Sequence, residues 1–236
     1  MKLSKSRLLS AWQCPKRLYL ETHHPELADV SESMEAMFAL GHDVGAMARS
    51  LYGTTDAIFE RTFEHDGILV RVDALLPDGD GWRVVEVKAS TEVKDYHVLD
   101  CAIQDWVLTN AGFGISSISV AHVNNQFIYG GDGVYDGLLI EEDLTETIRT
   151  VEPRVKDLIA TARDAVSGSL PNVTVGPQCS KPYDCTFVNH CWPGDARYPI
   201  AGLKGSKAKL GQYVAAGCED IRDVPADAIS AETQLR

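Results

Sequence analysis

Residues 70–88, with the sequence VRVDALLPDGDGWRVVEVK, predict a β-hairpin around which the rest of the chain is organised. Apolar and polar residues alternate on both sides of PDGDG, which has the proline and glycines of a tight turn. Asp73 on the first strand, and Glu86 and Lys88 on one face of the second, are charged residues at strand centres. Such charges are costly to bury unless they pair with one another or bind a metal. The hairpin alone is compatible with a surface ion pair and with a functional site.

The composition indicates one good hydrophobic core with a small appendage. The chain has 236 residues, 44% of them hydrophobic, and no apolar run approaches the length of a membrane span. The first twenty residues are basic but lack the apolar core of a signal peptide, so we expect a cytoplasmic protein that does not bind membranes. Six cysteines in such a protein favour metal or redox chemistry over a disulfide framework.

The charge is unevenly distributed. A formal net charge of −12 argues against a nonspecific nucleic-acid coat, which is normally basic. Two local clusters remain compatible with a phosphate-backbone ligand. They are Lys2, Lys5, Arg7, Lys16 and Arg17 at one end, and Lys204, Lys207 and Lys209 near the other.

The order of patterns predicts an α/β fold with a central mixed sheet flanked by helices. Capping residues, glycines and prolines mark the ends and breaks of the segments. The expected helices cover residues 4–21 (broken at Cys14-Pro15), 31–52, 95–111 and 144–166 (bent at Pro153); the expected strands cover 57–63, the hairpin and 115–123, with 127–129 as a candidate neighbour.

The helix expected over residues 31–52 has two further features. Its apolar positions are Met34, Met37, Phe38, Val44 and Met47. Gly41 and Gly45, four residues apart, are expected to let another backbone approach closely. His42 and Asp43 between them are, by their pattern alone, surface or packing residues.

Residues 179–191, CSKPYDCTFVNHC, form a cysteine-rich loop. Cys179, Cys185 and Cys191 are evenly spaced, and so irregular a segment is expected to need a cross-link. With Cys14 as a distant fourth thiolate they would complete a Cys₄ iron–sulfur site. With His190 they would form a Cys₃His zinc site, although zinc sites usually have tighter spacing. A metal-free loop, with Cys14 as a small buried side chain, is the third possibility.

Together these residues resemble the RecB-like branch of the PD-(D/E)XK nucleases, and most closely its iron–sulfur members, the AddB-type and CRISPR-associated RecB-like exonucleases. The resemblance covers roughly residues 3–200 and depends on five features in order. They are LSKSRLLSAWQCPKRLYL near the N-terminus, Asp73, the triplet Glu86-Val87-Lys88, Gln104, and the cysteines of residues 179–191. It implies a restriction-endonuclease-like core over residues 1–200, with an iron–sulfur-stapled helical and loop subdomain.

The resemblance also implies a divalent-metal-dependent nuclease, an exonuclease acting on single-stranded DNA or DNA ends in repair or defence. Asp73, Glu86 and the carbonyl of Val87 would hold Mg²⁺ or Mn²⁺, as hard oxygen ligands do. Lys88 would orient or help activate a metal-bound water and stabilise developing charge, and Gln104 would help position the site or the DNA. Cys14, Cys179, Cys185 and Cys191 would hold a structural [4Fe–4S] cluster.

The sequence departs from the family pattern at three positions. Val72 precedes Asp73 in place of the motif's proline, a replacement that is common in this branch, and Leu108 replaces a tyrosine that often follows the glutamine by four residues. Gly45 stands where many relatives have a metal-binding histidine on the second helix. His42 or Asp43 would have to replace it from a different helical angle, and His42 is carried as the candidate ligand from that helix.

Residues 201–236 resemble a connector that leads, in longer relatives, into a second domain. The stretch LGQYVAAGCEDIRDVP predicts a helix, a glycine turn and a short second helix. The resemblance implies a downstream exonuclease or helicase partner. Two other function classes remain open from the sequence: a noncatalytic nucleic-acid-binding or scaffold module with the same fold and cluster, and a redox-sensing regulator.

Overall fold

The computed structural model describes residues 2–192, 197–203, 205–225 and 228. The chain divides into two compact units, each of which gathers residues far apart in sequence. One comprises Met1–Leu9 and Ser31–Ala160, and the other Ser10–Val30 and Thr161–Arg236. No helix in the described part of the chain is both long and apolar enough to cross a bilayer.

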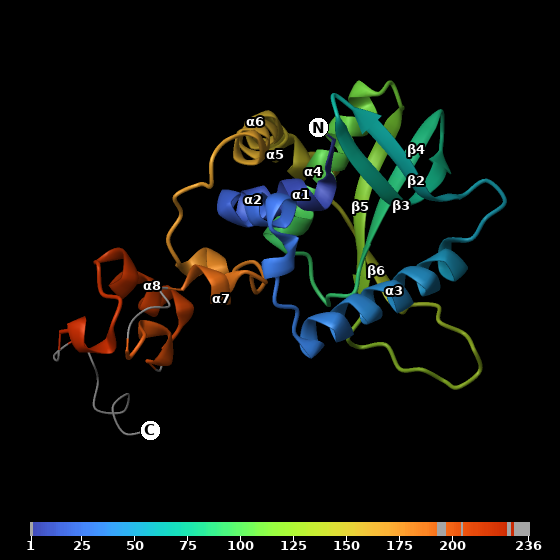
Figure 1. The fold of residues 1–236 in the computed structure, drawn as a ribbon. Helices are drawn as coiled ribbons and strands as arrows, with labels where there is room; N and C mark the ends of the chain where they lie inside the picture. The colour runs from blue at the N-terminus through green and yellow to red at the C-terminus, as the bar shows by residue number, and fades with distance from the viewer. Residues whose placement is uncertain (1, 193–196, 204, 226–227, 229–236) are drawn as a thin grey trace. The chain divides into compact units, whose positions relative to one another are not determined.

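The first unit is built on a six-stranded mixed sheet, which confirms the predicted α/β class (Figure 1). The strand order is β1-β3-β4-β5-β6, and β2 pairs with β3 off this path. The β1–β3 and β4–β5 pairs are parallel and the other pairs antiparallel. The strands are β1 (Leu3–Ser4), β2 (Ile58–His65), β3 (Ile68–Asp78), β4 (Gly81–Lys88), β5 (Ile115–Val123) and β6 (Leu139–Asp143).

The predicted hairpin is the centre of this sheet. β3 and β4 pair antiparallel up to Asp78 and Gly81, which leaves Gly79 and Asp80 as the turn. Gly79 has φ of +59°, a conformation that glycine adopts without a steric penalty. The turn is tighter than the predicted PDGDG segment because Pro77 and Asp78 still belong to β3.

The helices begin and break at the residues at which the sequence predicts these features. Cys14 separates the first two, with Pro15 at the first position of the second. The Ser31 side chain accepts a hydrogen bond from the Met34 N–H and so caps the third. Pro153 starts a new helix after a break at Glu152. The helices are α1 (Lys5–Gln13), α2 (Pro15–His23), α3 (Glu32–Tyr52), α4 (Asp95–Asn110), α5 (Thr145–Val151) and α6 (Pro153–Ser167).

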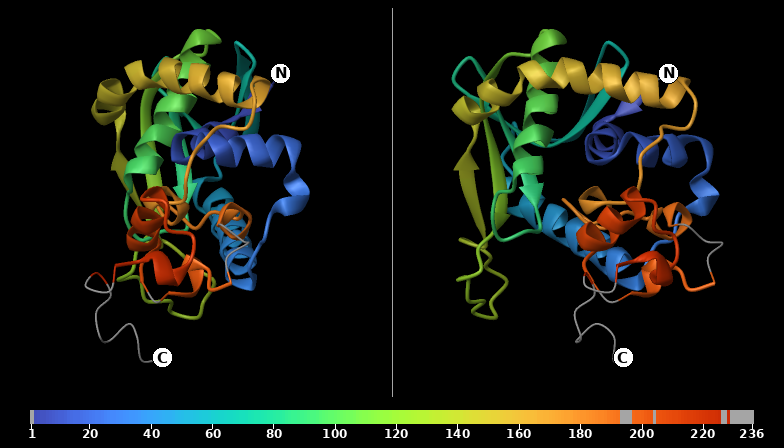
Figure 2. Two further views of the ribbon diagram at one scale, coloured as in Figure 1. Left: turned by 60° about the vertical axis from the view of Figure 1, so that its left-hand side comes forward. Right: turned by 90° about the vertical axis from the view of Figure 1, so that its left-hand side faces the viewer.

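The sheet is covered by helices on both faces (Figures 1 and 2). One face presents Ala74, Leu76 and Val85, which pack with Tyr52 at the end of α3. Alternation along β4 turns Glu86 to the other face, where Gln104 of α4 contacts it. The crossover from β4 through α4 to β5 makes those strands parallel, so α4 lies directly against the charged residues of the hairpin.

Two strand predictions need correction. Residues 127–129 form no strand; Phe127 donates its N–H to the Asn124 carbonyl in a turn. The neighbour of β5 is instead β6 (Leu139–Asp143), which the sequence pattern did not reveal. Its sequence, LIEED, has too short an alternation to predict a strand.

Two predictions on α3 are also wrong. Met37 and Phe38, expected on its apolar face, are 66% and 61% exposed, whereas Val44 and Ala48 are buried. A Cβ atom added at Gly41 or Gly45 would meet nothing within 4 Å, so no backbone in the described part of the chain approaches these glycines. The surface of α3 at these two glycines is therefore not packed against another segment of the described chain.

The second unit is a set of short helices around its own apolar side chains. Phe187 packs with Leu20 and Cys185, and Ile200, Leu210 and Val224 form a further cluster. The elements after α6 are η2 (Pro177–Cys179), α7 (Val188–Cys191), η3 (Ile200–Gly202), α8 (Lys207–Ala215) and η4 (Ile221–Asp223), and η1 (Pro25–Leu27) follows α2.

The predicted helix, glycine turn and second helix within residues 201–236 are confirmed as α8, Gly217 with φ of +88°, and η4. Lys204, residues 226–227 and residues 229–236 lie outside the described part. Gly211 has a packing role in α8, since a Cβ atom there would come within 2.5 Å of the Val175 carbonyl. This segment is therefore packed closely against the chain that precedes Cys179.

Candidate active site and cysteine pocket

The pairing between strands of the sheet is interrupted at Asp73. The β3–β4 ladder ends at Ala74 and Val85, one residue before Asp73 would face Glu86. Where the ladder ends, the Val87 N–H donates to Asp73 Oδ2 at 2.8 Å instead of to a backbone carbonyl. The β2–β3 ladder is interrupted at the same level, since Glu60 and Asp73 are unpaired between bonded neighbours. Asp73, Glu60 and Glu86 therefore stand together at one point where strand pairing is interrupted.

The Glu86 carboxylate accepts several hydrogen bonds from charged and polar side chains. It is 2% exposed, and both of its oxygens have partners. Oε1 accepts from Lys5 Nζ at 2.9 Å and from Lys88 Nζ at 2.5 Å, and Oε2 accepts from Gln104 Nε2 at 2.7 Å. The structure thus brings together four residues predicted for the site: Asp73, Glu86, Lys88 and Gln104.

Sequence reasoning missed two members of this network, Lys5 and Asp100. Asp100 is 2% exposed and lies 2.9 Å from Lys5 Nζ and 2.6 Å from Lys88 Nζ. Asp100 precedes Gln104 by four residues, so both lie on one face of α4, and this spacing could have predicted it. Lys5 was visible only as part of a basic segment, because its contacts depend on the tertiary fold.

Burial and neighbouring charges perturb the titration of this network. Burial, together with the Glu86 charge, raises the pKa of Asp73. Burial also acts to raise the pKa of Glu86, but Lys5 and Lys88 outweigh it and hold that pKa below its ordinary value. Burial acts to lower the pKa of Lys88, but Asp100 and Glu86 raise it well above the ordinary value. Lys88 is therefore a fixed positive charge, and Asp73 is the acid that retains a proton most readily.

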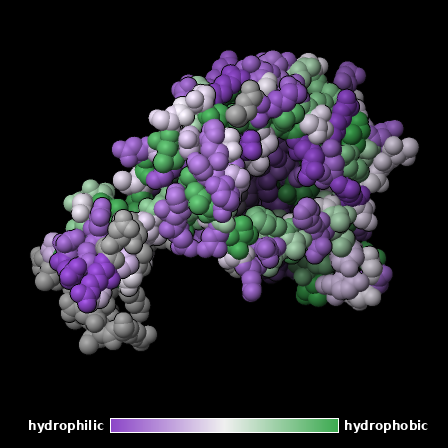
Figure 3. Space-filling view, viewed as in Figure 1, coloured by the Kyte–Doolittle hydropathy of each residue, from purple (hydrophilic) through white to green (hydrophobic). Residues whose placement is uncertain are grey.

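A groove of about 540 Å³ opens beside Asp73, between α3 and the sheet. Figure 3 shows the hollow between these elements. Asp73 and Val87 line it from the sheet, and His42 lines it from α3 beside Gly41. Asp43, the alternative to His42, is exposed and lies outside this lining. The structure thus places His42, rather than Asp43, on the same groove as Asp73.

The residues present fit a hard divalent cation. Three acids, Asp73, Glu86 and Asp100, face two lysines, and within the described residues Asp73 forms no ion pair. One negative charge is therefore uncompensated when Asp73 is ionised. The buried Gln104 Oε1 also has no hydrogen-bond partner. In the described residues no three His, Cys, Asp or Glu side chains gather as a complete metal cage. Two carboxylates, a carbonyl and water are, however, a usual set for Mg²⁺.

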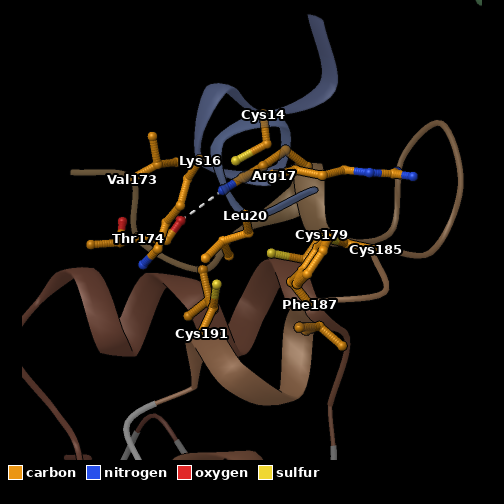
Figure 4. A pocket seen from close by; sticks show the side chains of 13 residues that line it. Cys14, Lys16, Arg17, Leu20, Val173, Thr174, Cys179, Cys185, Phe187 and Cys191 are labelled. Atoms are coloured by element: carbon orange, nitrogen blue, oxygen red, sulfur yellow. Dashed lines mark hydrogen bonds between the residues drawn. The ribbon is translucent and has the colours of Figure 1, made fainter. Parts of the chain in front are cut away.

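The four cysteines predicted for a cluster line one pocket of the second unit. Figure 4 shows the sulfur atoms of Cys14, Cys179 and Cys191 directed into it, with Cys185 beside Cys179. Cys14 is the N-cap of α2, Cys179 ends η2 and Cys191 ends α7. The Gly176 N–H donates to Cys179 Sγ at 3.5 Å. Residues more than 160 positions apart thus meet in one pocket, since 179 − 14 = 165.

Basic side chains lie beside the thiols in this pocket. Lys16 and Arg17 line it and offset the burial that raises the thiol pKa values of Cys14, Cys185 and Cys191. Four thiols are the donor set of a [4Fe–4S] cluster, in which each thiolate binds its own iron, and four thiolates also suit a zinc ion. His190, the alternative zinc ligand, is exposed and lies outside the pocket lining.

Comparison with known proteins shows the fold alone. No family model matches the sequence, and no curated protein does. Fourteen solved chains match the structure. One is the crystal structure of SSO0001, with a TM-score of 0.50 and 20% sequence identity over 80% of this chain and 85% of that chain.

Proposed function

We propose that the protein is a metal-dependent DNA nuclease of the RecB-like PD-(D/E)XK type, acting on single strands or ends. The observation that carries the proposal is the interruption of the sheet at Asp73, beside buried Glu86 and Lys88. Three elements far apart in sequence, α1, β4 and α4, contribute the side chains that contact Glu86, which are Lys5, Lys88 and Gln104. So concentrated a set of buried charges is costly and is typical of a functional site.

Asp73, Glu86 and the Val87 carbonyl would hold Mg²⁺ or Mn²⁺, with His42 as a further ligand from α3. A bound divalent cation supplies positive charge and lowers the pKa of a coordinated water. The Val87 N–H holds the Asp73 carboxylate in place at 2.8 Å. Gln104 holds Glu86 Oε2 at 2.7 Å, so the glutamine orients that carboxylate.

Lys88 stabilises negative charge at the scissile phosphate. Its raised pKa keeps the ammonium protonated, so it acts as a fixed cation and hydrogen-bond donor rather than as a base. Asp100, at 2.6 Å, supports this position from α4. Lys5 neutralises the remaining charge on Glu86 and Asp100 from α1.

Cys14, Cys179, Cys185 and Cys191 would hold a structural [4Fe–4S] cluster. Such a cluster supplies a covalent cross-link between distant segments of the second unit and requires no electron transfer. The paired basic side chains, Lys16 and Arg17, match the negative charge of four thiolates around a cluster.

The direct test is cleavage of labelled single-stranded DNA in Mg²⁺ or Mn²⁺ by the full chain, with EDTA as the blank. Lys88→Ala should reduce the rate at least about a hundredfold because charge stabilisation at the phosphate is lost. Lys156→Ala, which removes an exposed lysine of α6, is the matched control and should cleave normally. Cleavage that survives in both Lys88→Ala and Asp73→Ala, each shown to be folded by circular dichroism, overturns the proposal.

A noncatalytic nucleic-acid-binding module is the second candidate. It is favoured by Glu86, whose two oxygens accept hydrogen bonds from Lys5, Lys88 and Gln104. The two candidates differ in one result. DNA binding with no cleavage in either metal, by protein with its iron intact, identifies the module.

A further inference from the structure

Two arginines face each other across one carboxylate in the groove beside Asp73. Arg71 Nε of β3 lies 2.7 Å from Glu60 Oε2, and Arg49 Nη2 of α3 lies 3.1 Å from Glu60 Oε1. All three side chains line the groove together with Asp73. The arginines are 66% and 54% exposed, so these ion pairs are weak and readily exchanged.

Glu60 occupies a strained position. Its φ is +55°, in the left-handed region that residues other than glycine rarely adopt. It stands where the β2–β3 ladder is interrupted, opposite Asp73. The strained backbone directs a carboxylate, an anion with two oxygens, at a pair of guanidinium groups.

The α3 wall of the groove carries exposed apolar side chains as well as Arg49. Phe38 and Met37 of α3 line it and are 61% and 66% exposed. Gly41 and Gly45 add no side chain to this wall, and a Cβ atom at either would meet nothing within 4 Å, so there is open space beside His42. An exposed aromatic ring beside open space is the kind of surface on which an unpaired base stacks.

We infer that this groove binds a single-stranded nucleic acid next to Asp73, with Arg49 and Arg71 on a phosphate and Phe38 against a base. Glu60 holds the two arginines in place and is displaced by the phosphate. The groove volume of about 540 Å³ is within the range of small-ligand pockets and is large enough for one or two nucleotides. The inference rests on the proposed function, because the groove would bind the nucleic acid that the candidate nuclease site cleaves.

The test measures binding without cleavage. Fluorescence anisotropy of a short labelled single-stranded DNA, titrated with the full chain in EDTA, gives the affinity and its salt dependence. Arg49→Ala and Arg71→Ala should each weaken binding about fivefold or more and reduce the salt slope by about 0.7. Glu60→Gln should tighten binding about two- to fivefold, the range of an exposed ion pair. Phe38→Ala should weaken it about tenfold.

Matched controls exist in the same unit. Arg149 and Glu146 form an exposed pair on α5, with exposed fractions of 67% and 81%, so Arg149→Ala and Glu146→Gln make the same charge changes elsewhere. Leu40→Ala removes an exposed apolar side chain of α3 that does not line the groove. All three should bind as the unaltered protein does.

Three outcomes overturn the inference. One is weaker or unchanged binding by Glu60→Gln. The second is an equal effect of the control variants, or tighter binding of a blunt duplex than of the single strand. In the third, the groove variants bind normally while Lys88→Ala abolishes cleavage, so the inference fails and the proposed nuclease stands. No binding and no cleavage by the unaltered protein contradict both.

Discussion

Glu86 is a buried carboxylate that is stable only because of its partners. It accepts hydrogen bonds from two lysines and one amide, and its exposed fraction is 2%. Removing one partner of a buried ion pair commonly costs about 3–5 kcal/mol, since the remaining charge is left without compensation. Lys88 variants must therefore be checked for folding before their activity is interpreted.

Glu60 allows a stability test of the strained backbone. Both Glu60→Gly and Glu60→Gln remove its exposed ion pairs, but only glycine relieves the φ of +55°. We expect Glu60→Gly to unfold at higher denaturant concentration than Glu60→Gln, with a difference of about 1 kcal/mol. Urea titration followed by circular dichroism measures it.

The control for this test is Glu64 in the same strand, which pairs with Lys2. Glu64 lies in ordinary extended backbone, so glycine there should be less stable than glutamine by about 0.5–1 kcal/mol. The same order of stability at both positions would show that Glu60 is not strained.

The sequence could predict Asp73, Glu86 and Lys88 because alternation in a hairpin determines which side chains share a face. It could not predict Lys5, whose contacts with Glu86 and Asp100 depend on where α1 lies against the sheet. Gly41 and Gly45 were misinterpreted for a related reason. Two glycines four residues apart are compatible with close packing of a backbone and with an open groove surface. Only the fold distinguishes these two possibilities.

At the scale of elements, α4 is the helix that completes the candidate site. It is buried around most of its circumference, so apolar periodicity did not identify the face with His97, Asp100 and Gln104. These three residues are spaced by three and four positions and share one face. Polar residues at helical spacing within an otherwise apolar helix are therefore the sequence signal for this part of the site.

The N-terminus of α4 should make stability sensitive to acid. His97 is 1% exposed, and its Nδ1 accepts the Lys94 N–H at 3.1 Å. Burial and the charge of Lys88 lower the pKa of His97 from 6.5 to about 4. The neutral ring is the folded form, so its stabilisation is complete above pH 6.5 and is lost as pH falls from there toward 4.

His97→Gln keeps an acceptor for the Lys94 N–H and removes the titration. Between pH 7.5 and 4.5, the unaltered protein should lose about 1–2 kcal/mol more unfolding free energy than the variant. Chemical denaturation at a series of pH values measures the difference. Parallel pH profiles for the two proteins would contradict the assignment of a neutral buried ring.

The sequence did not predict the strands in which apolar and polar residues alternate over the fewest positions. β5 was predicted with its observed bounds, Ile115–Val123, because nine residues alternate clearly. β6 has five residues and a long loop before it, so the apolar Phe127 and Tyr129 were a misleading alternative. Local pattern length limits such predictions more than residue type does.

At the scale of the whole chain, the cysteine pocket joins segments that are distant in sequence. Cys14 and Cys179 are 165 positions apart. A covalent cross-link over so long a loop removes chain entropy from the unfolded state, up to about 5 kcal/mol in the chain-entropy model. A cluster there would stabilise the fold without taking part in catalysis.

We expect protein purified without oxygen to be brown and to contain iron and sulfide. Cys14→Ser and Cys179→Ser should lose most of the iron and melt at lower temperature. Cys218→Ser is the matched control, because Cys218 packs in a separate cluster of the second unit and should leave the iron content unchanged. Iron-free protein, or equal iron loss in Cys218→Ser, would contradict the assignment.

The most direct measurement of the central claim is Mn²⁺ binding, followed by electron paramagnetic resonance and calorimetry on the full chain. The account predicts one bound ion, with release of a proton because burial raises the pKa of Asp73. Asp73→Asn should abolish this binding, whereas Asp80→Asn, in the exposed hairpin turn, should retain it. Equal Mn²⁺ binding by Asp73→Asn and the unaltered protein would contradict the claim that Asp73 and Glu86 form the metal site.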